Sequence, residues 1–146
     1  MRPDPSRALE GVATALLTAL AAEVRTPFGQ SQAQIAGVIN AILAHELDGL
    51  ADRLASENTA VSAILREALP LLDRDVARAV EDALALVPPD IRVSSLQRVN
   101  DALRAALVDA HAAVESLPVP EASAVNERIW DELRESTRRR HIEVGR

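Results

Sequence analysis

The chain has 146 residues, of which 48% are apolar, and its 22 acidic residues outnumber 16 basic residues to give a net charge of −6. This negative charge opposes broad binding to nucleic-acid phosphates and to anionic membranes. The absence of cysteine excludes disulfides, thiol catalysis and cysteine metal sites. The length suits a single hydrophobic core. We therefore expect one domain over residues 1–146, in the cytoplasm, with no cofactor and no nucleic-acid or membrane partner.

The N-terminal segment combines features of a secretory leader with those of an amphipathic helix. Two arginines precede an uncharged run over residues 11–22, as in a leader. Asp4 and Glu10 interrupt that pattern, however, and apolar residues recur at helical spacing from position 9 to position 24. Asp4 is also followed by proline, which is typical of a helix start, because the aspartate can cap the first turn. We expect a helix over residues 5–25 and no export.

Residues 26–44 carry no charge, although 26% of the whole chain is charged. The segment reads TPFGQSQAQIAGVINAILA, and its interspersed Gln, Ser and Asn side chains exclude a membrane span. Ser31 and Gln34 have capping-box spacing, which predicts a helix that begins there and extends to about Glu57. Because this helix lacks a charged face over its first half, we expect neighbouring helices or a partner chain to cover it.

The rest of the chain alternates helical patterns with breaks at Asn58, at the VPPD sequence of residues 87–90 and at the PVP sequence of residues 118–120. Further helices are expected over residues 61–72, 73–87, 94–117 and 121–140. Pro70 should kink or end the first of these, and Ser94 or Ser95 should cap the third. The last helix should turn four side chains inward: Val125, Ile129, Trp130 and Leu133. No strand-like alternation is evident. The sequence therefore predicts an all-α fold, an antiparallel helical bundle of five to six helices.

Motifs of the common enzyme classes are missing from the sequence. It contains no glycine-rich phosphate loop, no G-x-S-x-G elbow, no H-E-x-x-H and no cysteine nucleophile. Three histidines and scattered serines do not define a catalytic triad. We therefore favour a non-catalytic protein.

One side of the uncharged segment carries small and amide side chains. Gln32, Ala36 and Asn40 lie four residues apart in one row of a helix, with Gly37 beside them. Such a patch can pack on the chain's own loops, bind a small polar ligand or seat a partner helix. We predict that these four residues are the centre of a contact surface for a second copy of the chain or for another subunit of a larger complex.

An alternative function is the binding of a metal ion or small ligand by inward carboxylate and histidine side chains. The candidate ligands are Glu23, His45, Glu46, His111 and Glu115. Glu46 falls on the apolar stripe of its helix, and His111 and Glu115 are spaced so that both can reach one ion. The set lacks the Glu-x-x-His pairs of di-iron bundles. The competing interpretation pairs Glu46 with Arg25 or Arg53 and leaves the histidines at the surface.

The C-terminus is rich in arginine. The run consists of Arg138, Arg139, Arg140 and His141, and the chain ends with Arg146. Basic side chains on a last helical turn interact favourably with the negative end of the helix dipole, and a phosphate-bearing or acidic partner is the functional alternative. Without interleaved aromatic residues the run does not predict a nucleic-acid module. The sequence also allows residues 138–146 to form a mobile Arg-rich tail.

Residues 16–50 contain Glu23-Val24, Pro27, Gly29, the apolar run of residues 35–43 and His45-Glu46-Leu47. With these residues the segment resembles the opening of a family of small uncharacterised helical proteins of bacteria. Members of that family are encoded beside aminoglycoside-phosphotransferase-like and acyl-CoA-dehydrogenase-like proteins, so the resemblance implies an accessory or subunit role. It assigns no functional residue. The final third of the chain, with Trp130 and the arginine run, departs from the ending of that family.

Overall fold

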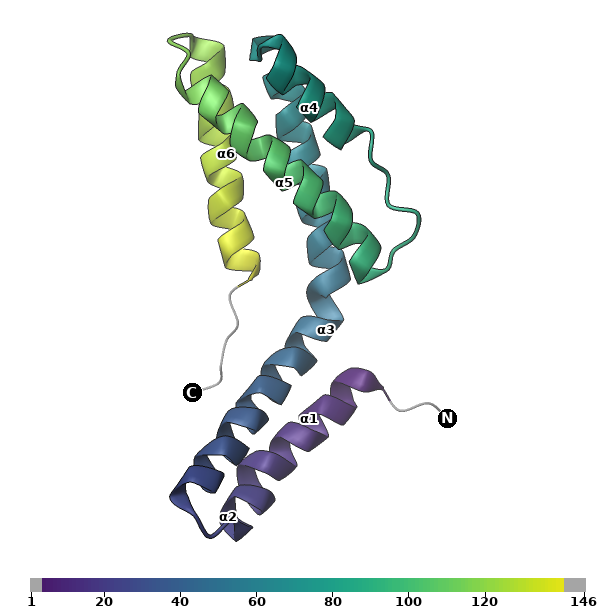
Figure 1. Ribbon diagram of the computed structural model, residues 1–146, viewed down its shortest axis with the longest axis vertical. Coiled ribbons are helices and arrows are strands. Elements are labelled where there is room, and N and C mark those ends of the chain that lie inside the picture. Colours follow the sequence, from purple (N-terminus) through teal and green to yellow (C-terminus); the bar gives the residue numbers. More distant parts are fainter. Residues whose placement is uncertain (1–3, 141–146) are drawn as a thin grey trace. The chain divides into compact units, whose positions relative to one another are not determined.

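The computed structural model describes residues 4–140, which form helices and connecting turns and contain no strand (Figure 1). The elements are α1 (Pro5–Ala15), the π-helical turn η1 (Leu16–Leu20), α2 (Ala21–Glu23), α3 (Pro27–Ala68), the 3₁₀ turn η2 (Leu69–Leu71), α4 (Arg74–Leu84), α5 (Val93–Glu115) and α6 (Pro120–Arg139). This arrangement confirms the predicted all-α helical bundle.

Contacts between residues divide the described chain into two compact units, with the boundary between Leu50 and Ala51 inside α3. The sequence had been interpreted as one domain over residues 1–146. The first unit contains α1, η1, α2 and the N-terminal part of α3. The second contains the remainder of α3 together with η2, α4, α5 and α6. The long helix therefore contributes its two halves to two separate sets of packing contacts.

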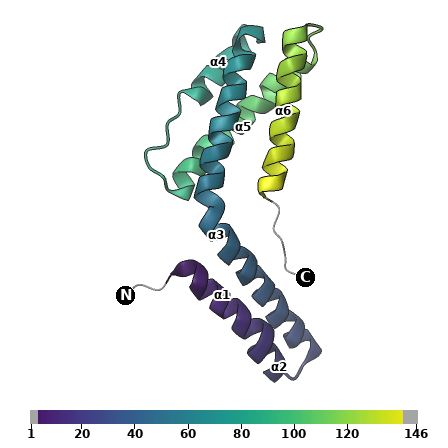
Figure 2. The ribbon, with the colours of Figure 1, turned by 180° about the vertical axis from the view of Figure 1, so that it is seen from behind.

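The first unit is a helical hairpin, in which α1, η1 and α2 lie alongside the N-terminal part of α3 (Figure 1 and Figure 2). Asp4 starts the hairpin as predicted, because its Oδ1 accepts hydrogen bonds from the backbone N–H groups of Ser6, at 2.9 Å, and Arg7, at 3.3 Å. Pro5 occupies the first helical position, where no N–H is needed. The predicted helix start at Asp4 is therefore confirmed.

The structure corrects the predicted start of the next helix. α3 begins at Pro27 and not at Ser31. Thr26 is the N-cap, since its Oγ1 accepts a hydrogen bond from the Gly29 N–H at 3.1 Å, and the following proline again occupies the first helical position. The capping-box spacing of Ser31 and Gln34 predicted the later start, although Thr-Pro is equally typical of a helix start.

The predicted break at Asn58 was wrong, because α3 continues through it to Ala68. Asparagine in a helix costs only a fraction of a kcal/mol, about 0.7 at most, relative to alanine, so the residue does not by itself end one. Its side chain also has tertiary partners here. Asn58 Nδ2 donates to the Leu96 carbonyl oxygen at 3.1 Å, and Asn58 Oδ1 accepts from Asn100 Nδ2 at 2.9 Å. These contacts to α5 favour the helical conformation at Asn58.

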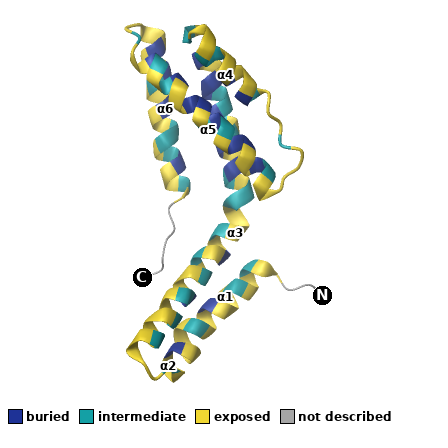
Figure 3. Cartoon of the chain, in the orientation of Figure 1, coloured by how far each residue is buried: buried dark blue, intermediate teal, exposed yellow. Residues whose placement is uncertain are grey.

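The second unit holds the main hydrophobic core, which appears as the concentration of dark blue in Figure 3. Four helices supply its buried side chains: Val61, Ile64, Leu65 and Ala68 from α3; Val80 and Ala83 from α4; Val99, Leu103, Ala106, Leu107, Ala110 and Val114 from α5; Ala122, Val125 and Ile129 from α6. The apolar residues that recur at helical spacing in this part of the sequence therefore supply the buried side chains of the core. The expected end of a helix near Pro70 is also confirmed, by the turn η2.

The connection between α4 and α5 contains the predicted Val-Pro-Pro-Asp stop, and α5 then begins at Val93. The capping prediction was wrong, because Arg92 and not Ser94 or Ser95 is the N-cap residue, with no side-chain cap. Asp90 Oδ1 instead accepts from the Arg92 backbone N–H at 3.1 Å. That hydrogen bond holds the turn immediately before the helix.

No helix within residues 4–140 is both long and apolar enough to cross a membrane. α3 has sufficient length, with 42 residues, but its uncharged first part contains Gln, Ser and Asn side chains, and acidic and basic side chains follow from His45 onward.

Candidate functional site

The hairpin of the first unit is held together by small residues. Gly37 and Ala44 of α3 and Ala13 and Ala21 of the N-terminal helices are buried. A Cβ added to Gly37 would lie 2.6 Å from Leu17 Cγ, which is closer than real side-chain contacts. The missing side chain therefore allows the two arms of the hairpin to approach closely.

The opposite side of α3 exposes large apolar side chains. Successive helical residues are turned by about 100°, so positions two residues from Gly37 point away from the N-terminal arm. Ile35 and Ile39 occupy those positions and are 53% and 50% exposed. The same broad face carries three further exposed side chains. We define the outer face of α3 as Phe28, Ile35, Val38, Ile39 and Leu43.

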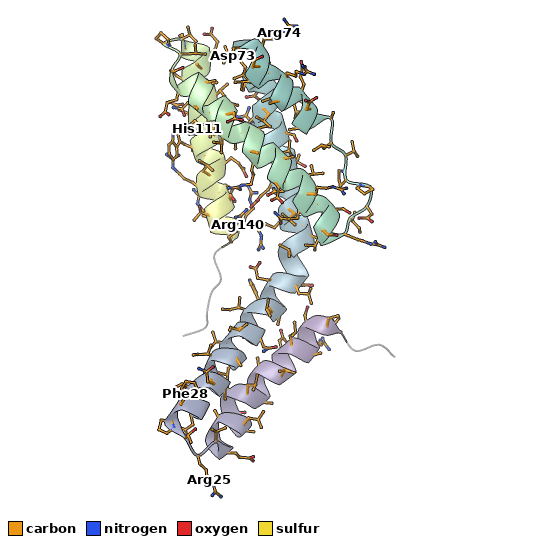
Figure 4. All side chains as sticks on the ribbon, viewed as in Figure 1. Arg25, Phe28, Asp73, Arg74, His111 and Arg140 are labelled. Carbon is orange, nitrogen blue, oxygen red and sulfur yellow. The ribbon has the colours of Figure 1, made fainter. Side chains whose placement is uncertain are left out.

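The outer face lies within the uncharged segment identified in the sequence. Phe28, at its N-terminal end, is 76% exposed and is labelled at the start of α3 in Figure 4. Exposed large apolar side chains usually occur singly, whereas a contiguous patch of them marks an interaction site. Within the part of the chain that the structure describes, this face is the clearest candidate interaction surface.

The four residues predicted as the contact centre do not share one exposed face. Gln32 is exposed, Ala36 and Asn40 are half-buried, and Gly37 is buried against Leu17. Asn40 Nδ2 donates a hydrogen bond at 2.9 Å to the Ala36 carbonyl oxygen of its own helix. The small and amide residues thus lie largely toward the hairpin interior. The sequence pattern does not reveal the outer face, because its isoleucines and leucine have the same helical spacing as side chains that pack into a core.

The five candidate metal ligands are distributed over both units: Glu23, His45 and Glu46 belong to the first, His111 and Glu115 to the second. Among residues 4–140, no group of three or more His, Asp or Glu side chains is placed to hold a metal ion. The spacing of His111 and Glu115 on one helix therefore does not produce a converging ligand set.

His111 has partners in α6 instead. Its Nε2 shares a hydrogen bond with Asn126 Oδ1 at 2.8 Å, and its ring makes a T-shaped contact with Trp130, with 5.5 Å between ring centroids and 82° between ring planes. Trp130 was predicted to face inward, but it is 45% exposed. The structure corrects that expectation, because the indole packs on the imidazole at the surface of the α5–α6 pair and not in the core.

A buried carboxylate lies in the second unit, where α3 meets the C-terminal end of α6. Glu57 of α3 is 1% exposed. Its Oε1 accepts from Ser136 Oγ at 2.9 Å and from Arg140 Nε at 3.2 Å. Its Oε2 accepts from Arg140 Nη2 at 2.7 Å and from Asn100 Nδ2 at 3.4 Å, and Arg104 Nη1 lies 3.7 Å away. One side chain of α3 thereby contacts both α5 and α6.

These surroundings keep Glu57 ionised. Burial raises the pKa of its carboxyl, but the hydrogen bonds from Arg140 and Ser136 and the charges of Arg140 and Arg104 outweigh burial. The net result is a pKa below the ordinary 4.5. A carboxylate that is saturated with donors and hard to protonate is a poor general base. The cluster therefore serves to join three helices. In the sequence Glu57 is only one acidic residue in a helical pattern, and nothing there indicates its partners.

The described part of the C-terminal arginine run belongs to α6 and its cap, and each arginine has an acidic partner. Arg138 pairs with Glu135 at 2.7 Å, Arg139 with Glu132 at 2.8 Å, and Arg140 with Glu57 at 2.7 Å. These internal pairs already neutralise the three charges that a phosphate-bearing partner would require. His141 and Arg146, together with the rest of the predicted tail beyond position 140, lie outside the described residues.

Comparison of the chain with protein-family models, with curated proteins and with solved structures gave no match. The residues described here define a helical protein with an exposed apolar helix face in one unit and a core tied by a buried carboxylate in the other.

Proposed function

We propose that this chain is a non-catalytic interaction protein of the cytoplasm, and that it self-associates through the outer face of α3. The observation that carries the proposal is the exposure of five large apolar side chains along a segment without charge, residues 26–44. Several such side chains on one helical face mark an interaction surface.

The hairpin needs a further packing partner because it buries little by itself. Its buried residues are three alanines and Gly37, and no large side chain of residues 4–50 is among the buried ones. Two helices alone leave most of their apolar surface in water (Figure 3). If two hairpins packed outer face to outer face, they would form a four-helix arrangement that covers both surfaces.

A second copy suits this face for two reasons. Residues 26–44 carry no charge, so no like-charge contact opposes the approach of two identical faces despite the net charge of −6. A two-fold interface also brings the same patch from each copy together, which matches one apolar face with another of the same length.

The expected affinity is modest. Covering a half-exposed Val, Leu, Ile or Phe contributes about 1 kcal/mol, so ten such side chains in a dimer contribute roughly 10 kcal/mol. Association costs at least about 4 kcal/mol in lost translational and rotational freedom. The net value is therefore at most about 6 kcal/mol, which corresponds to a dissociation constant of roughly 10–100 μM or weaker. The oligomer should therefore depend on concentration.

Light scattering coupled to size exclusion tests the proposal on the full chain, over loading concentrations from about 10 to about 1,000 μM. The wild type should shift from monomer toward dimer as its concentration rises. Ile39→Arg should remain a monomer throughout, because the substitution places a charge in the centre of the outer face. Ile35→Arg should behave in the same way.

The matched control is Val108→Arg. Val108 lies on α5 and is 69% exposed, so the same chemical change occurs outside the outer face. This variant should dimerise like the wild type, and circular dichroism should show unchanged helicity in all variants. A wild type that stays monomeric would refute self-association, as would a dimer that survives both isoleucine substitutions.

The sequence resemblance supports an interaction role independently of the exposed side chains. The segment that resembles small bacterial helical proteins, residues 16–50, contains the whole outer face. An accessory or subunit role, which that resemblance implies, would require a contact surface in the same part of the chain.

A further inference from the structure

The second unit contains an open groove between α3, α5 and the connection that precedes α5. Its volume is about 420 Å³, within the range typical of small-molecule sites. Leu96, Val99 and Leu103 form an apolar floor, and Val87 and Pro88 line the side formed by the connection. A groove of this kind suits a hydrocarbon chain.

The α3 wall of the groove is polar. Asn58, Ser62 and Arg66 lie on it at helical spacing, so all three belong to one face of the helix. The Asn58 amide already bonds to Leu96 and Asn100 and is held in place. The Thr59 hydroxyl, which also lines the groove, donates to the Ala55 carbonyl oxygen of its own helix at 2.9 Å. The groups left to meet a ligand are therefore the Ser62 hydroxyl and the Arg66 guanidinium.

The charge of the groove favours an anionic ligand. Arg66 is the only charged side chain that lines it, and its guanidinium forms no ion pair or hydrogen bond with the described part of the chain. No acidic residue lines the groove to repel an anion. A guanidinium presents paired N–H donors that match the two oxygens of a carboxylate.

We propose that this groove binds an amphipathic carboxylate of medium chain length, with the hydrocarbon over Leu96, Val99 and Leu103 and the carboxylate at Arg66 and Ser62. The site is independent of the outer face of α3, because all of its lining residues belong to the second unit.

Isothermal titration of the full chain with decanoate, below its micelle concentration, tests the assignment. Decanoate should bind the wild type, and Arg66→Gln should weaken binding by roughly three- to tenfold, the effect of losing one exposed charge-assisted contact. Decan-1-ol should bind both proteins equally, since it lacks the carboxylate. Ala55→Phe, at an exposed position on the groove wall, should reduce the binding of both ligands.

Two controls separate this site from other apolar surfaces. Arg78→Gln removes an exposed arginine of α4 that does not line the groove and should leave decanoate binding unchanged. Ile39→Arg should also leave it unchanged, so failure of self-association would not affect this result. The proposal is overturned if decanoate does not bind, if Arg66→Gln binds it as tightly as the wild type, or if decyltrimethylammonium binds equally well.

Discussion

Leu17 of the N-terminal arm lies directly against Gly37 of α3. A Cβ added to Gly37 would lie 2.6 Å from Leu17 Cγ and 3.3 Å from the Ala13 carbonyl oxygen. The leucine side chain therefore occupies the space that any other residue at position 37 would fill. This contact sets the distance between the two arms and turns the large apolar side chains of α3 outward.

The substitution Gly37→Leu should open the hairpin. The new side chain must displace Leu17 or the backbone near Ala13, at a cost of about 1–3 kcal/mol for overpacking. Leucine is a good helix former, so a loss of stability would not reflect helix propensity. Hydrogen exchange of the backbone amides of α1 should become faster, while exchange in α5 stays unchanged.

Gly11→Ala and Gly49→Ala are the matched controls for that experiment. Nothing lies within 4 Å of a Cβ added at either position. Both positions are inside helices of the same unit, so each alanine should stabilise by roughly 0.5–1 kcal/mol through helix propensity alone. Equal effects of Gly37→Leu and Gly49→Ala on amide exchange would contradict the close contact.

Thr26→Ala should destabilise the start of α3 by about 0.5–2 kcal/mol, because it removes the side-chain oxygen that accepts the Gly29 N–H. Ser31→Ala, at the cap expected from sequence, should change stability little, since that residue lies inside the helix. Thermal unfolding followed by circular dichroism compares the two variants. A larger loss for the serine variant would argue against Thr26 as the cap.

Glu57→Gln should lower the free energy of unfolding at neutral pH by roughly 1–3 kcal/mol, the cost of weakening charged hydrogen bonds at a buried group. Arg140 is half-exposed and can regain water, which limits the loss. Chemical denaturation at pH 7 measures the difference. The control is Glu67→Gln, which removes an exposed ion pair with Arg128 and should cost no more than about 1 kcal/mol.

The effect of Glu57→Gln should also depend on pH. The pKa of Glu57 is lowered in the folded chain relative to the ordinary 4.5, so the unfolded chain takes up the proton first as the pH falls. The stability contributed by this carboxylate is fully present above about pH 4.5. It is lost as the pH falls through the lower pKa that Glu57 has in the folded chain. The difference between wild type and variant should shrink below pH 4.5. A difference that is constant from pH 7 down to acid unfolding would show that ionisation of Glu57 is not the cause.

Self-association through the outer face should resist salt. An apolar interface has no ion pairs to screen, so raising sodium chloride from about 0.05 to about 0.5 M should leave the dimer fraction unchanged or higher, although the Debye length shortens several-fold. Sodium sulfate should increase it, because that salt strengthens apolar burial. Sedimentation at fixed protein concentration measures the fraction. Dissociation by added salt would indicate an electrostatic contact elsewhere.

The contacts at the candidate sites join residues far apart in the sequence and could not be predicted from it. The sequence shows that residues 26–44 carry no charge, but it does not show which side of the helix is covered by the chain itself. Gly37 was expected to meet a partner and instead meets Leu17 of the same chain. Glu57 and Arg140, which are 83 residues apart, gave no signal of their pairing. Contacts between distant segments leave no periodic trace in a sequence.

The sequence by itself determined the all-α class, the helix start at Asp4 and the breaks around Pro70 and residues 87–90, because capping, proline geometry and the 3.6-residue period act between near neighbours. Only the tertiary structure decided which apolar stripe is covered. Ile35 and Ile39 have the same i, i+4 spacing as Val61 and Leu65, yet the first pair is exposed and the second is buried. Burial depends on which distant segment packs against a face, and spacing along one helix cannot specify that segment.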